Sequence, residues 1–160
     1  MEELIMYIKK LFGIVSQLRA DLLYKYAKEA IGTDSSPEDN APDEYGCVDS
    51  ATAIIQKVLP FIPRMVSTIR FDEYMAGSGA FQKINTIEPK CIIVSVTGSG
   101  NGSIVGHTGI VGKNTAPDGS LWIMSNDSRS GLWQANFTHS SWIKRYVLRG
   151  GLKTNYYKLI

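Results

Sequence analysis

The sequence predicts an α+β fold in which a helix packs against an antiparallel β-sheet. Helical periodicity is confined to the part of the chain before Gly79, and short β-rich runs follow it. Asp118-Gly119 lies between two of these runs and is typical of the tight turn that joins neighbouring antiparallel strands. Helices first and strands second favour a segregated α+β architecture. A chain of 160 residues suits a single domain, expected to span residues 1–160.

Residues 1–31 are expected to form an N-terminal amphipathic helix. Apolar residues recur every four positions from Leu18 to Ala30, and the pattern ends at Gly32. Ahead of this stretch the chain reads MEELIMYIKKLFGIVSQ, in which apolar residues alternate with short charged groups. We expect the apolar stripe of this helix to pack on the rest of the domain.

The first residues do not read as a signal peptide or as a transmembrane span. Glu2 and Glu3 stand where a signal peptide carries positive charge, and Lys9 and Lys10 interrupt the apolar run. The sequence therefore predicts a protein made in the cytoplasm without a signal peptide and without a transmembrane segment.

The remaining elements follow a polar loop over residues 33–46, which contains two prolines and shows no periodicity. A helix is expected to begin at Cys47, with its apolar face turned inward, and to end before Pro60. A shorter helix is expected over residues 67–76. The predicted strands have apolar, β-branched runs and cover residues 91–96, 107–111, 121–125 and 155–159.

Composition and charge exclude several function classes. The net charge is +2 and no basic run is present, so we expect no nucleic-acid partner. The chain has two cysteines and two histidines without a CxxC pair, so no metal site or cofactor is expected. The glycine-rich loop over residues 97–106 lacks the Lys-Ser or Lys-Thr of a phosphate-binding loop and leads into a strand.

Cys47 and His107 are the candidate nucleophile and base. A cysteine nucleophile acts as a thiolate, which the positive end of a helix dipole and a nearby imidazolium both stabilise. Cys47 opens a helix and faces inward, toward the predicted sheet. His107 opens a strand, and Gly106 and Gly109 are expected to leave space beside its ring. For an isolated cysteine, burial as a small core residue is the alternative role, and this is the role expected of Cys91.

Supporting groups are expected around this pair. A base needs a third residue to orient it, and either Asn126 or Asp127, at the end of the following strand, would lie near His107. The backbone N–H of Cys47 would form an oxyanion hole, with Tyr45 as a second donor. Trp133 lies just past that strand and is a candidate to line a substrate groove, although tryptophan more often belongs to the core.

Four segments carry a family resemblance: DEYGCVDSA (43–51), TGSGNGSIVGHTGIVG (97–112), IMSNDS (123–128) and GLWQANFTHSSWIKRY (131–146). In their order and residue types they resemble the CHAP-like group of papain-like NlpC/P60 cysteine peptidases, which is often found in bacteriophage. The resemblance covers roughly residues 20 to 160. The chain departs from many relatives in carrying Lys90-Cys91 where they have Gly-Asp, and the third catalytic position varies within the superfamily.

The resemblance implies a papain-like NlpC/P60 fold, with the catalytic core over residues 43–160. It implies a thiol protease or amidase of the endolysin type that cuts peptidoglycan peptides through Cys47, His107 and Asn126. It also implies a monomer that needs no cofactor and acts on the cell wall after lysis or as part of a phage particle. Two alternatives remain: a non-catalytic cell-wall-binding module, and a toxin or effector cysteine hydrolase that acts on a protein or a small amide.

Overall fold

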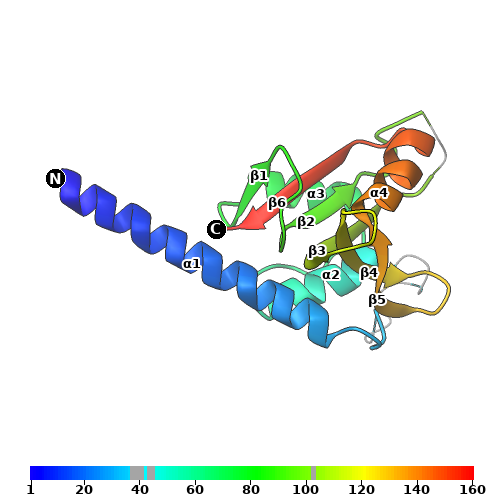
Figure 1. Cartoon of the computed structure of the whole chain (residues 1–160), viewed down its shortest axis with the longest axis horizontal. Coiled ribbons are helices and arrows are strands. Elements are labelled where there is room, and N and C mark those ends of the chain that lie inside the picture. Colours follow the sequence, from blue (N-terminus) through cyan, green and yellow to red (C-terminus); the bar gives the residue numbers. More distant parts are fainter. Residues whose placement is uncertain (37–41, 43–45, 102–103) are drawn as a thin grey trace.

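The computed structural model describes residues 1–36, 42, 46–101 and 104–160 and has an antiparallel sheet covered by helices (Figure 1). The helices are α1 (Glu2–Glu29), α2 (Cys47–Gln56), α3 (Thr68–Gly77), the short α4 (His139–Trp142) and the π-helix η2 (Ile143–Arg149). The strands are β1 (Phe81–Ile84), β2 (Ile92–Ser95), β3 (His107–Thr115), β4 (Leu121–Asp127), β5 (Leu132–Thr138) and β6 (Thr154–Leu159). The α+β class is therefore confirmed.

The described strands form one sheet in the order β1-β6-β2-β3-β4-β5, with all neighbours antiparallel. The turn at Asp118-Gly119 joins β3 to β4 as expected, and Gly119 has a φ of +79°, which glycine adopts without strain. β1 and β5 are not among the strands predicted from the sequence. β1 is only four residues long, and the apolar residues of β5 are interrupted by polar ones.

The two faces of the sheet bury separate apolar clusters. On one face α2 packs through Ala51 and Ile55 against sheet residues such as Ile110. On the other face Trp142 and Tyr146, from α4 and η2, pack against sheet residues such as Val111. Because successive strand residues point to opposite faces, Ile110 and Val111 divide between the two clusters. The predicted packing of a helix on the sheet is confirmed.

The N-terminal helix packs on the domain only through its second half. Leu23 and Ala27 are fully buried. Ser16 and Arg19 donate to the carbonyl groups of Leu159 and Ile160, and Asp21 pairs with a lysine at the start of β2. The first half extends away from the domain (Figure 1). Within the described residues, no helix has the length and apolar character needed to cross a membrane.

Candidate active site

Cys47 is the first residue of α2 and is 6% exposed. Its side chain lies near the start of β3, where the backbone N–H of Thr108 is close enough to the sulfur to lower the pKa of the thiol. Burial raises the pKa of the Cys47 thiol to about 11, and the nearby backbone N–H groups oppose this only in part. The resting side chain is therefore a neutral thiol.

His107 is the first residue of β3 and pairs with Ser95 of β2. Its ring stacks on the rings of Trp142 and Tyr146, with centroids 5.3 and 5.5 Å away. Burial, and then the nearby guanidinium of Arg145, lower the pKa of His107 to about 3, which a hydrogen bond to the backbone of Asn126 opposes. The resting imidazole is therefore neutral.

A chain of hydrogen bonds fixes which ring nitrogen of His107 carries the proton. Nε2 lies 3.0 Å from Oγ of Ser125, whose hydroxyl donates to Oδ1 of Asn136 at 2.6 Å. The amide of Asn136 is oriented by its Nδ2, which donates to the carbonyl oxygen of Asn126. The single proton of Ser125 is thus used, so its oxygen accepts from Nε2–H of His107. Nδ1 is left with the basic lone pair.

This assignment predicts that His107 is the neutral Nε2–H tautomer at pH 7. The ¹⁵N chemical shifts of its two ring nitrogens measure the tautomer directly. Ser125→Ala removes the acceptor and should shift the population away from Nε2–H, whereas the exposed Ser130→Ala should leave it unchanged. A ring protonated on Nδ1 in the wild-type protein would contradict the hydrogen-bond chain.

The structure places the other expected site residues as follows. Asn126 meets the ring through its backbone, while its side chain bonds to Ser35. The carboxylate of Asp127 accepts from Ser130 at 2.8 Å. Trp133 is 1% exposed and donates from its indole N–H to the carbonyl of Ala27, so it lies in the core under α1, where it also lines a small pocket of about 120 Å³. Tyr45 lies outside the described residues.

The glycines around His107 serve a purpose different from the one expected. A Cβ at Gly106 would lie 2.1 Å from the carbonyl oxygen of Ser95, and a Cβ at Gly109 would lie 2.7 Å from Ile123 Cγ2. Both glycines therefore allow the neighbouring strands to approach, and the space beside the ring is filled by aromatic side chains.

Cys47 and His107 reach the start of β3 from opposite faces of the sheet. Cys47 belongs to the cluster under α2, and the ring of His107 lies with the side chains of α4 and η2. Two electrostatic effects nevertheless indicate that Cys47 and His107 lie in the same region of the molecule. The backbone N–H of Thr108, the residue after His107, lowers the pKa of the Cys47 thiol, and the charge of a Cys47 thiolate contributes to the raised pKa of Tyr146, whose main cause is burial.

A polar pocket of about 430 Å³ opens beside His107. Its described lining includes the carboxylate of Asp127 and the guanidinium groups of Arg129 and Arg145. Sequence reasoning missed Ser125, Asn136 and Arg145 as parts of this site. The alternation of side chains along β4 would have placed Ser125 on the same face of the sheet as His107. The register shift between β4 and β5, which brings Asn136 next to Ser125, has no signal in the sequence.

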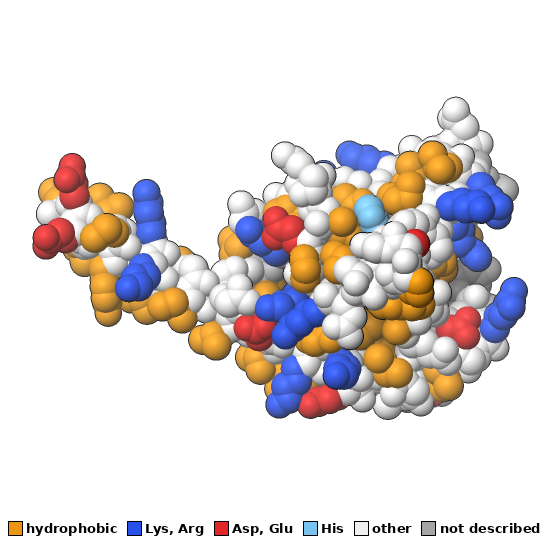
Figure 2. Space-filling view, viewed as in Figure 1, with side chains coloured by type: hydrophobic (Ala, Val, Ile, Leu, Met, Phe, Trp, Pro, Cys, Tyr) orange, Lys and Arg blue, Asp and Glu red, His pale blue; other side chains and the backbone are white. Residues whose placement is uncertain are grey.

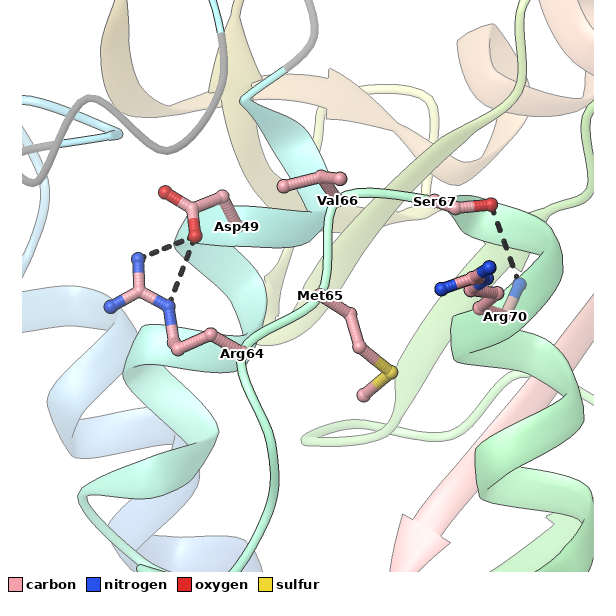
Figure 3. Close-up of a pocket in the computed structure, with 6 residues that line it drawn as sticks. All are labelled: Asp49, Arg64, Met65, Val66, Ser67 and Arg70. Atoms are coloured by element: carbon pink, nitrogen blue, oxygen red, sulfur yellow. Dashed lines mark hydrogen bonds and ion pairs between the residues drawn. The ribbon is translucent and has the colours of Figure 1, made fainter.

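A second pocket, of about 380 Å³, lies beside the first turn of α2 (Figure 3). Its lining includes Asp49, which is fully buried and accepts from Nε and a terminal nitrogen of Arg64 at 3.0 and 2.6 Å. Ser36 donates to the same carboxylate at 2.6 Å. A buried charge requires such partners, and an acidic residue in the first turn also complements the helix dipole. Asp49 therefore anchors the end of α2 that carries Cys47.

Comparison of the chain with protein-family models, with curated proteins and with solved structures gave no match.

Proposed function

We propose that this chain is a cysteine hydrolase that cleaves amide bonds in peptidoglycan peptides, with Cys47 as nucleophile and His107 as base. The observation that carries the proposal is that Cys47, the first residue of α2, lies close enough to the backbone N–H of Thr108, the residue after His107, for that N–H to lower the pKa of the thiol. The substrate class comes from the resemblance to CHAP-like peptidases.

The resting protonation states decide the form of the mechanism. The thiol and the imidazole are both neutral, so no thiolate–imidazolium pair exists before substrate binds. Nδ1 of His107 takes the thiol proton as the sulfur attacks the amide carbonyl, and then gives it to the leaving amine. A water molecule next attacks the thioester and gives a proton to Nδ1, which passes it to the leaving sulfur, so that the carboxylic acid and the Cys47 thiol are released.

Access to the sulfur is part of the proposal. Cys47 is buried and reaches β3 from the face opposite to His107, so the proposal requires the start of α2 to move until the sulfur reaches both Nδ1 and the substrate. The pocket beside His107 is the proposed binding region for the peptide. Its Arg129 and Arg145 suit the carboxylates of peptidoglycan stem peptides, because guanidinium groups bind carboxylates with charge-assisted hydrogen bonds.

Digestion of purified sacculi tests the proposal. The wild-type protein should release soluble muropeptides detectable by mass spectrometry, and the masses of the new ends separate endopeptidase from amidase cleavage. Cys47→Ala should abolish release, because the nucleophile is lost. Cys91→Ala is the matched control, since Cys91 is also buried but packs on the other face of the sheet. Release that survives Cys47→Ala would contradict the proposal.

A non-catalytic cell-wall-binding module is the second candidate. The raised pKa and burial of Cys47 favour it, because a reactive cysteine is ordinarily an exposed thiolate. For such a module, the wild-type protein and Cys47→Ala should pellet equally with sacculi, and neither should release muropeptides. Muropeptide release by the wild-type protein excludes this reading.

A further inference from the structure

In the first half of α1, no side chain is buried against the rest of the described chain. All of residues 1–15 are exposed, although most of them are apolar. Figure 2 shows these hydrophobic side chains along the projecting helix. A helix of this length is marginal in water without tertiary contacts, so its stability calls for a partner.

The apolar residues of α1 follow a heptad spacing. Six of the large aliphatic side chains recur at intervals that alternate between four and three residues, and Ile5 and Ile14 lie beside this series. The a positions are occupied by Ile8, Val15 and Leu22, and the d positions by Leu4, Leu11 and Leu18. All six side chains are exposed, from 38% for Val15 to 62% for Leu4. We call these six residues the α1 seam. A spacing of this kind is the pattern of a coiled coil.

The α1 seam is exposed along its length, although Leu11 and Val15 also line a pocket of about 300 Å³ with Gly79 and Ile160 of the domain. Three residues that hold α1 to the domain, Ser16, Leu23 and Ala27, fall at heptad positions b and f, opposite the seam. Arg19 and Asp21, which also contact the domain, fall at e and g, beside it. Leu18 and Leu22 lie in the half of the helix that packs on the domain, yet they remain 58% and 40% exposed. The side chains of the α1 seam therefore remain accessible to a second helix.

We propose that α1 pairs with α1 of a second copy of this chain as a parallel, two-stranded coiled coil. β-branched residues at a, here Ile8 and Val15, together with leucine at d favour parallel dimers over higher oligomers. In a parallel coiled coil, the residue at a g position lies beside the e residue that is five positions later in the partner helix. Tyr7 would therefore contact Phe12 of the second copy, and both aromatic side chains would be buried in addition to the α1 seam. This replaces the sequence-based expectation of a monomer and does not depend on the proposed hydrolase activity.

A membrane surface fits the same helix less well. The charged residues of its projecting half are Glu2, Glu3, Lys9 and Lys10, two of each sign. Helices that bind anionic membranes carry a polar face rich in lysine and arginine. The charge pattern therefore favours a protein partner, and the heptad spacing selects a second copy.

Sedimentation equilibrium of the full chain tests the pairing. The wild-type protein should sediment with the mass of two 17.7 kDa chains at micromolar concentration, and Leu11→Glu should shift it to the mass of one. Met6→Glu is the matched control, because Met6 is an exposed apolar residue at an f position outside the α1 seam. It should leave the dimer intact. A wild-type protein with the mass of one chain overturns the proposal.

Oxidation of Leu4→Cys tests the parallel orientation. Equivalent d positions lie next to each other in a parallel pair, so this variant should form an intermolecular disulfide, while the two natural cysteines are buried. Met6→Cys should crosslink far less. Equal crosslinking at both positions overturns the parallel arrangement. Co-sedimentation of the wild-type protein, but not of Leu11→Glu, with phosphatidylglycerol vesicles while both remain single chains in solution would assign the helix to a membrane instead.

Discussion

Gly106→Ala is expected to destabilise the protein by about 3 kcal/mol, at the upper end of the range for a methyl group forced into a packed interior. The added Cβ would lie 2.1 Å from the carbonyl oxygen of Ser95 and 2.6 Å from the backbone nitrogen of Thr97. Both are backbone atoms at the end of β2, so they cannot move aside as a side chain would. The same shift would disturb His107, the next residue along the chain.

Chemical denaturation with matched glycine variants measures this effect. Gly77→Ala is the control, because Gly77 is the last residue of α3 and a Cβ there meets no atom within 4 Å. That variant should be stabilised by about 0.4 to 1 kcal/mol through the reduced entropy of the unfolded chain. A Gly106→Ala protein as stable as Gly77→Ala would show that β2 and β3 do not approach as described.

Much of the fold could be predicted from local patterns. The helix that begins at Cys47 and the cap at Ser67, which accepts from the N–H of Arg70, follow from periodicity and local hydrogen bonding. β1 could not be predicted, because its pairing with β6 joins segments more than seventy residues apart and only Phe81 of its four residues is buried. Its position is set by the tertiary fold.

The residues of the candidate site also fall into those that the sequence predicts and those that depend on the tertiary fold. Cys47 and His107 could be proposed because each begins an element, and the sequence marks where elements begin. The orienting group could not be identified, because a one-residue shift along β4 exchanges the two faces of the sheet. Ser125 consequently points toward His107, whereas the side chain of Asn126 points to Ser35 on the other face.

The stability of the protein is expected to fall as the pH is lowered from about 6.5, and His107 should be the main cause above pH 4. Its pKa is 6.5 in an unfolded chain and about 3 in the native state, because burial and Arg145 oppose protonation. The stabilisation from the neutral ring is complete above pH 6.5 and is lost as the pH falls toward 3. Each pH unit well inside this window removes about 1.4 kcal/mol, and less is lost near pH 6.5, where the unfolded histidine is only half protonated. The loss between pH 6.5 and 4.5 should therefore be roughly 2 kcal/mol.

Two histidine variants assign this pH dependence. His107→Gln should remove most of the slope between pH 6.5 and 4.5 in the free energy of unfolding by urea. His139→Gln is the control: the pKa of His139 is also lowered by burial, but this residue is only half-buried, so most of the slope should remain. Carboxylates with lowered pKa values, such as Asp127, titrate near pH 4 and below, outside this window. A slope unchanged in His107→Gln would mean that the ring is protonated in the native state near pH 6, and Nδ1 would then be unable to act as the base at that pH.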